Sequence, residues 1–219
     1  MKSHKGGLHR DLSLAVGAAK HFRYARVPDV LTESDFDKLL SHINRSSPTG
    51  RRDYAVILLA ARYGMRPSDI RQLRLDDIRW RENYIAFRQS KTGKNVTLPL
   101  LAEVSEALID YLRAGRPSTL VRNIFVRHEP PIEPYSSRSG FYNIMRRALH
   151  RAGLDRRRGS RGLYLLRHTL ATRMLRAQIP MKTIGDVLGH TTMNSTFVYT
   201  KVDVSALCSA SLSIAEVLT

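Results

Sequence analysis

The sequence predicts a mainly α-helical protein with a small antiparallel β-sheet. Most of the chain places apolar residues at helical spacing, whereas one short region between residues 84 and 100 alternates apolar and polar residues on both sides of a turn. The 219 residues, of which 42% are hydrophobic, are enough for one sizeable packed domain.

The folded part is expected to begin at residue 27. Residues 1–26 start with a stretch rich in Lys, His and Gly and are interpreted as a linker or the remnant of another domain. Val27–Pro28 then gives the chain a rigid entry. Thr32 is typical of an N-cap, with Asp35 as its capping-box partner, and a helix therefore begins here. Residues 27–219 are expected to form a single domain.

Two helices with a sharp turn between them follow. Residues 51–63 are strongly apolar, which predicts a buried helix, and Gly64 ends it. Pro67 suits the first turn of the next helix. Asp69 lies three residues after Arg66, so on a helix the two side chains share a face and the carboxylate can orient the guanidinium.

A β-hairpin is predicted next. Residues 84–88 and 96–100 are the two strands, and residues 90–95 form the turn, with Lys91 near its tip. A nucleotide-binding P-loop does not fit Thr92-Gly93-Lys94-Asn95, because the upstream glycine and the Ser or Thr after the lysine are both missing.

The remainder is expected to be helical, apart from a short strand at residues 124–126, a proline-rich loop at 129–134 and a basic loop at 156–161. The expected helices are residues 102–114, 139–152, 164–177, 181–188, 192–199 and 204–218.

The charge balance indicates a nucleic-acid partner. Lys and Arg number 36 against 19 Asp and Glu, and the net charge of +17 is spread along the chain. A spread excess of arginine suits a folded surface that meets a polyanion. A membrane surface is disfavoured, since neither a basic amphipathic helix nor a long apolar run stands out.

Cys208 is the only cysteine, so neither a disulfide framework nor a cysteine-based zinc site can be built. The N-terminus lacks an apolar signal core, and a cytoplasmic location is expected.

Several widely separated side chains suit phosphodiester chemistry: Arg66, Lys91, Arg167, His190 and Tyr199. A guanidinium can donate two parallel hydrogen bonds to phosphate oxygens, and a phenolic oxygen can attack phosphorus while fixed donors hold the developing charge. Taken alone, each residue also fits a purely structural role: a surface ion pair, an exposed turn residue, a helix cap or a core aromatic. The order and spacing of the whole set favour the functional interpretation.

The contexts of these residues resemble the catalytic domain of the tyrosine recombinases, the phage-integrase family, over roughly residues 27 to 205. The resemblance is carried by Gly64-Met65-Arg66-Pro67-Ser68-Asp69, by Leu166-Arg167-His168-Thr169, by Leu188-Gly189-His190, and by Tyr199 nine residues after His190.

The resemblance implies a role for each candidate. Tyr199 is the nucleophile that forms a 3′-phosphotyrosyl bond, and Arg66, Arg167 and His190 stabilise the pentavalent phosphorus. Lys91 protonates the leaving 5′ oxygen, with Lys94 as a nearby rival. No cofactor is implied, because the covalent bond conserves the phosphodiester energy, and no acidic cluster in the sequence suggests a catalytic metal.

The chain departs from the family pattern at Tyr164, where a histidine usually lies three residues before the second arginine. A phenol can hydrogen-bond a phosphate but is a poor proton acceptor near neutral pH. Tyr164 and Asp69 are therefore secondary site candidates. His168 is interpreted as structural.

Family members also carry an N-terminal helical domain that clamps the DNA, and residues 1–26 are interpreted as its tail and the linker. The resemblance further implies double-stranded DNA as partner and a tetramer on two DNA sites. The helix at 204–218 either docks on a neighbouring subunit or packs within its own domain. Two alternative functions are a DNA-binding fragment with little or no recombinase activity and a relaxing topoisomerase.

Overall fold

The structure, a computed structural model, describes residues 29–136, 138–155 and 162–189. Its elements in chain order are α1 (Glu33–Ser41), α2 (Pro48–Tyr63), α3 (Pro67–Gln72), the 3-10 turn η2 (Leu75–Asp77), β1 (Ile78–Arg79), β2 (Tyr84–Arg88), β3 (Asn95–Pro99), α4 (Ala102–Ala114), α5 (Arg138–Arg151), α6 (Tyr164–Arg176) and α7 (Met181–Leu188). This order confirms a mainly α-helical fold with a small antiparallel sheet. The helices expected at 192–199 and 204–218, the basic loop at 156–161 and the expected linker at 1–26 lie outside the described residues.

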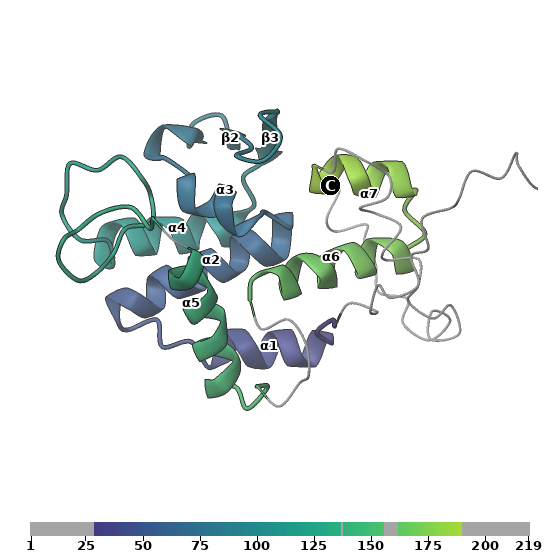
Figure 1. Ribbon diagram of the computed structural model, residues 1–219, viewed down its shortest axis with the longest axis horizontal. Coiled ribbons are helices and arrows are strands. Elements are labelled where there is room, and N and C mark those ends of the chain that lie inside the picture. Colours follow the sequence, from purple (N-terminus) through teal and green to yellow (C-terminus); the bar gives the residue numbers. More distant parts are fainter. Residues whose placement is uncertain (1–28, 137, 156–161, 190–219) are drawn as a thin grey trace, which may run out of the picture.

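Helix α2 is the centre of the fold. Its residues from Ala55 to Ala60 are all fully buried, as expected for a helix that is apolar on every side. The helices α1, α3, α4, α5 and α6 lie around it, and the sheet lies beyond α3 at the upper edge (Figure 1). Because α2 is surrounded, its C-terminal end at Tyr63 lies inside the molecule, with Tyr63 itself 7% exposed.

The helix boundaries follow from local capping. Thr32 and Asp35 form the expected capping box, in which Asp35 N donates to Thr32 Oγ1 at 3.1 Å and Thr32 N donates to Asp35 Oδ2 at 3.2 Å. Helix α2 begins at Pro48 rather than at residue 51, because Ser47 Oγ accepts from Gly50 N at 3.0 Å and the proline takes the first helical position. Gly64 ends α2 in the left-handed conformation, at φ 59°.

The sheet has three antiparallel strands in the order β1-β2-β3. Its hairpin pairs Tyr84 with Pro99 and Arg88 with Asn95, so the turn at residues 89–94 confirms the predicted hairpin. The predicted strand at 124–126 is wrong: within this segment Val126 forms an isolated bridge to Pro134, and the neighbouring Asn123 forms another to Arg74. Its three apolar residues are buried because they pack in the core, and burial alone does not distinguish a strand from a packed loop.

Helices α6 and α7 share a separate small core of Ala171, Met174, Ile184 and Leu188. Figure 1 shows α7 lying on α6, on the side away from α1. In the part of the chain that the structure describes, no helix has both the length and the apolar character needed to cross a bilayer.

One half-buried histidine predicts a loss of stability in acid. The His128 ring stacks on Tyr111 at 5.9 Å, and Nε2 lies 3.3 Å from Tyr111 Oη. Burial, aided by the charge of Arg52, lowers the pKa of His128 from 6.5 to about 4. Between these two values the unfolded chain binds the proton more readily, so stability falls as the pH is lowered through that window.

We therefore expect His128→Gln to weaken the pH dependence of thermal unfolding. Because His128 is only half-buried, its contribution is reduced to about 1 kcal/mol at pH 5, or roughly 2–4 °C in melting temperature. The measurement is the difference in melting temperature between pH 7 and pH 5, for both proteins. An identical difference in the variant would show that His128 does not cause the acid sensitivity.

Candidate active site

Arg66 is the first buried cation of the site. It is the residue before the first turn of α3, in extended conformation at φ −68° and ψ 144°, and is only 7% exposed. Its Nη2 donates to the carbonyl oxygen of Gly189, and its Nη1 lies 3.8 Å from Asp69 Oδ2. Nη1 is buried and has no hydrogen-bond partner among the described residues. A buried guanidinium nitrogen without an acceptor is costly, so this atom is suited to an anion from outside.

Arg167 reaches the same place from α6. It is 4% exposed, and it donates from Nη1 to the carbonyl oxygen of Gly64 and from Nη2 to that of Leu188, the latter at 2.6 Å. Arg66 and Arg167 thus bond to the carbonyls of consecutive residues at the end of α7. Their guanidinium groups are neighbours, although their positions in the sequence are 101 apart.

Two glycines permit this convergence. Gly64 and Gly189 both adopt left-handed conformations, at φ 59° and φ 63°, which end α2 and α7. A Cβ on Gly64 would lie 2.6 Å from a methyl of Leu188, and one on Gly189 would lie 2.0 Å from the Gln89 side chain. The chain therefore passes closely at both points. A small cavity lies between them, lined by Arg66, Asp69, Arg167 and apolar side chains of β2, β3 and α7.

The structure joins the hairpin turn to this site. Asp69 is 3% exposed, and its Oδ1 accepts from both Ser90 N at 2.9 Å and Ser90 Oγ at 2.6 Å. Lys91, the next residue, is exposed at the turn. The predicted face-sharing of Arg66 and Asp69 is thus observed, and Asp69 additionally brings the lysine turn beside the two arginines.

Tyr164 is the first residue of α6 and is 46% exposed. Its ring centroid lies 6.4 Å from that of His168, one helical turn further on, so its nearest recorded ring contact is with His168. The pKa of His168 is lowered, chiefly by burial and then by the nearby Arg167 charge. A partly buried His168 within the fold agrees with a structural role. His190 and Tyr199 lie outside the described residues.

Sequence reasoning missed two parts of the site, namely Ser90 and Gln89. Gln89 is 5% exposed and accepts at Oε1 from Thr92 Oγ1 at 2.6 Å, while its side chain packs against Gly189. A serine directly before the candidate lysine is a weak signal, since no sequence rule connects it with a carboxylate 21 residues upstream.

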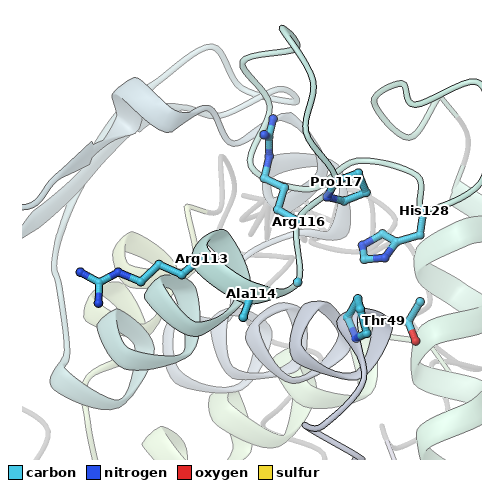
Figure 2. Close-up of a pocket in the computed structure, with 8 residues that line it drawn as sticks. Thr49, Arg113, Ala114, Arg116, Pro117 and His128 are labelled. Carbon is cyan, nitrogen blue, oxygen red and sulfur yellow. The ribbon is translucent and has the colours of Figure 1, made fainter.

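A larger hollow of about 580 Å³ lies elsewhere, between the start of α2 and the end of α4 (Figure 2). Thr49, Pro117 and His128 face it, whereas the side chains of Arg113 and Arg116 point away from it. The Arg116 guanidinium is already bonded to the carbonyls of Val121, Asn123 and Ile124. Helix α2 separates this hollow from the arginine pair by roughly 20 Å, so it plays no part in the site.

The family model described as "Phage integrase family" matches residues 29–205. The protein y4rA of Sinorhizobium fredii, named an integrase/recombinase, is 41% identical over 93% of this chain. The chain spans 49% of the length of y4rA, that is, about half.

Two solved structures have the same fold. The XerA recombinase superposes with a TM-score of 0.69 at 26% identity, covering 83% of this chain and 63% of that one. Lambda integrase residues 75–356, bound to DNA, superposes with a TM-score of 0.57 at 25% identity, covering 77% of this chain and 59% of that one.

Proposed function

Because the chain belongs to the phage integrase family, we propose that it is the catalytic domain of a site-specific tyrosine recombinase that breaks and rejoins DNA. The observation that carries this proposal is the pair of buried arginines, Arg66 and Arg167, held side by side, with Arg66 Nη1 finding no acceptor within residues 29–136, 138–155 and 162–189. Two neighbouring guanidinium groups form a forked donor surface that suits the oxygens of one phosphate.

The reaction begins with attack of the Tyr199 phenolic oxygen on the scissile phosphorus. A bond forms between that oxygen and phosphorus, the bond from phosphorus to the 5′ oxygen breaks, and the phenolic proton passes to water. The product is a 3′-phosphotyrosyl bond and a free 5′ hydroxyl, which can attack the equivalent bond on a partner strand. The phosphodiester energy is retained throughout.

The remaining residues act on the charge that builds during this step. Arg66, Arg167 and His190 donate hydrogen bonds to the non-bridging oxygens of the pentavalent phosphorus. Lys91 gives its proton to the leaving 5′ oxygen. Asp69 supports this arrangement, since it lies against Arg66 and is bonded to the turn that carries Lys91.

Double-stranded DNA is the proposed partner, with assembly into a tetramer on two sites and a cytoplasmic location. The net charge of +17 and the family fold support a DNA partner. Lambda integrase, a structural neighbour, is bound to DNA in its solved structure.

DNA binding is expected to weaken steeply with salt. Each phosphate neutralised by Lys or Arg adds about 0.9 to the slope of log affinity against log salt, so six to ten contacts would lower affinity by roughly 10³- to 10⁵-fold between 50 and 200 mM salt. Fluorescence anisotropy of a labelled duplex across that range measures the slope. An affinity that stays constant would contradict a phosphate-based interface.

A second candidate function is a DNA-binding protein with little cleavage activity. Tyr164 favours it, because the half-exposed phenol stands where the family usually has an imidazole and cannot readily accept the proton of Tyr199. A suicide substrate with a nick beside the scissile phosphate separates the two functions. A recombinase accumulates a covalent adduct that survives denaturation, whereas a binding protein shifts the DNA without forming one. Adducts formed without strand exchange on intact sites would indicate a relaxing topoisomerase instead.

A further inference from the structure

The Asp69 carboxylate bridges two parts of the candidate active site. Its Oδ2 lies 3.8 Å from Arg66 Nη1, and its Oδ1 accepts two hydrogen bonds from Ser90, from the backbone N at 2.9 Å and from Oγ at 2.6 Å. At 3% exposure Asp69 is almost completely shielded from water, so these donors supply its charge compensation. The position of Ser90 is thereby tied to the arginine.

The turn beyond Ser90 is closed on itself. Gln89 N donates to the Lys94 carbonyl at 2.8 Å, and Gly93 N donates to the Gln89 carbonyl at 2.9 Å. Thr92 Oγ1 donates to Gln89 Oε1 at 2.6 Å. With its own hydrogen bonds made, the turn can move as one body, and its link to α3 is the contact between Ser90 and Asp69.

We propose that Ser90 is a positioning residue for Lys91. By bonding to Asp69, its hydroxyl keeps the turn that carries Lys91 at a fixed position relative to Arg66. This inference rests on the proposed function, in which Lys91 protonates the leaving 5′ oxygen. Lysine carries its ammonium on a flexible four-carbon stem. Whether the ammonium reaches the leaving 5′ oxygen therefore depends on where the backbone at residue 91 is fixed. A displacement of about 1 Å in a catalytic group can lower a rate by up to about a hundredfold.

The hydrogen bond from the Ser90 hydroxyl to Asp69 can be removed without removing the one from the Ser90 backbone N–H. In Ser90→Ala, Asp69 Oδ1 keeps the backbone donor and loses only the Oγ donor, so the turn stays attached but is held less firmly. Ser90 is exposed, and the substitution leaves no core cavity. A hydrogen bond to a carboxylate is worth more than a neutral one, so we expect cleavage to slow about tenfold while the melting temperature stays nearly constant.

A change of the leaving atom from oxygen to sulfur tests the role of the proton donor. A purely structural defect would slow cleavage of both substrates alike. With the natural substrate, the bond from phosphorus to the 5′ oxygen breaks and that oxygen takes a proton from the Lys91 ammonium. With sulfur in place of the bridging 5′ oxygen, the leaving thiolate is a far weaker base, with a thiol pKa of about 8.5, and it departs without a proton. Loss of the acid then has little effect, whereas loss of arginine function still slows the reaction.

The experiment measures single-turnover cleavage of the 5′-oxygen and 5′-sulfur suicide substrates. Lys91→Ala reports on the proposed function: it should be slow on oxygen and restored on sulfur. Ser90→Ala should follow the same pattern with a smaller loss, and Ser90→Thr, which keeps a hydroxyl, should restore cleavage on oxygen. Thr97→Ala removes an exposed hydroxyl from β3 of the same hairpin and should match the parent protein on both substrates.

The outcomes distinguish the role of Lys91 from that of Ser90. If Lys91→Ala is fully active or is not restored by sulfur, Lys91 is not the acid, and the assignment of Ser90 fails with it. If Lys91→Ala is restored but Ser90→Ala is unaffected, or is equally slow on both substrates, Lys91 keeps its role and Ser90 does not position it. Equal slowing of Ser90→Ala on both substrates would indicate that Ser90 acts through Asp69 on Arg66.

Discussion

Replacement of Tyr199 by phenylalanine is expected to abolish the covalent adduct between this protein and DNA. The substitution removes only the phenolic oxygen that is proposed to attack phosphorus, and it retains the aromatic ring. The affinity for DNA should stay nearly unchanged, because it comes from phosphate contacts made by many cations. The adduct is measured by denaturing electrophoresis after reaction with a nicked suicide substrate, and the affinity by anisotropy.

Tyr142→Phe is the matched control. Tyr142 is a surface tyrosine on α5, 46% exposed, and its loss of a hydroxyl should leave adduct formation intact. Persistence of the adduct in Tyr199→Phe, with the Tyr142 control behaving as the parent, would mean that another residue is the nucleophile.

Arg66→Lys and Arg167→Lys should each slow cleavage by roughly a hundred- to a thousandfold, the usual cost of losing one preorganised transition-state donor. Lysine keeps the charge but has no planar fork. At Arg66 one nitrogen bonds to Gly189 while Nη1 has no acceptor among the described residues, and a single ammonium cannot serve both positions equally. Single-turnover cleavage at saturating protein measures the effect on the chemical step.

Arg116→Lys is the matched control, which separates an effect on the cleavage rate from an effect on stability. Like Arg167, Arg116 bonds to backbone carbonyls, but it does so beside the hollow at the far end of α2. Its replacement should lower the melting temperature without the loss in cleavage rate. If Arg116→Lys slows cleavage as much as the two site variants at a similar loss of melting temperature, the effect of Arg66 and Arg167 is structural.

The fold was largely predictable because its elements carry local signals. The capping box at Thr32, Gly64 at the end of α2 and the alternation around residues 84–100 each act within a few residues. The predicted start of α2 is three residues late, because the apolar run begins only after Pro48 while the helix is already capped by Ser47. The segment 124–126 was assigned to a strand because three buried apolar residues look alike in a strand and in a packed loop.

Within the described part of the candidate site, a local pairing was predictable but the tertiary connections were not. The pairing of Arg66 with Asp69 follows from their spacing on one helix. The bonds of Arg167 to Gly64 and Leu188, and of Ser90 to Asp69, join residues that are brought together only by tertiary packing. The contact of the Tyr164 ring with His168, four residues further along the same helix, was also not predicted.

The end of α7 couples the two arginines. Arg66 bonds to Gly189 and Arg167 to Leu188, so fraying of this one helical terminus would loosen both cations together, while Arg167 would keep its bond to Gly64. The same terminus is followed at once by His190 and, ten residues after Gly189, by Tyr199. The stretch of backbone that leads to the proposed nucleophile is therefore also an anchor for the two arginines proposed to bind the phosphate. Unravelling of α7 would loosen both arginines at once, a safeguard against cleavage by a half-assembled site.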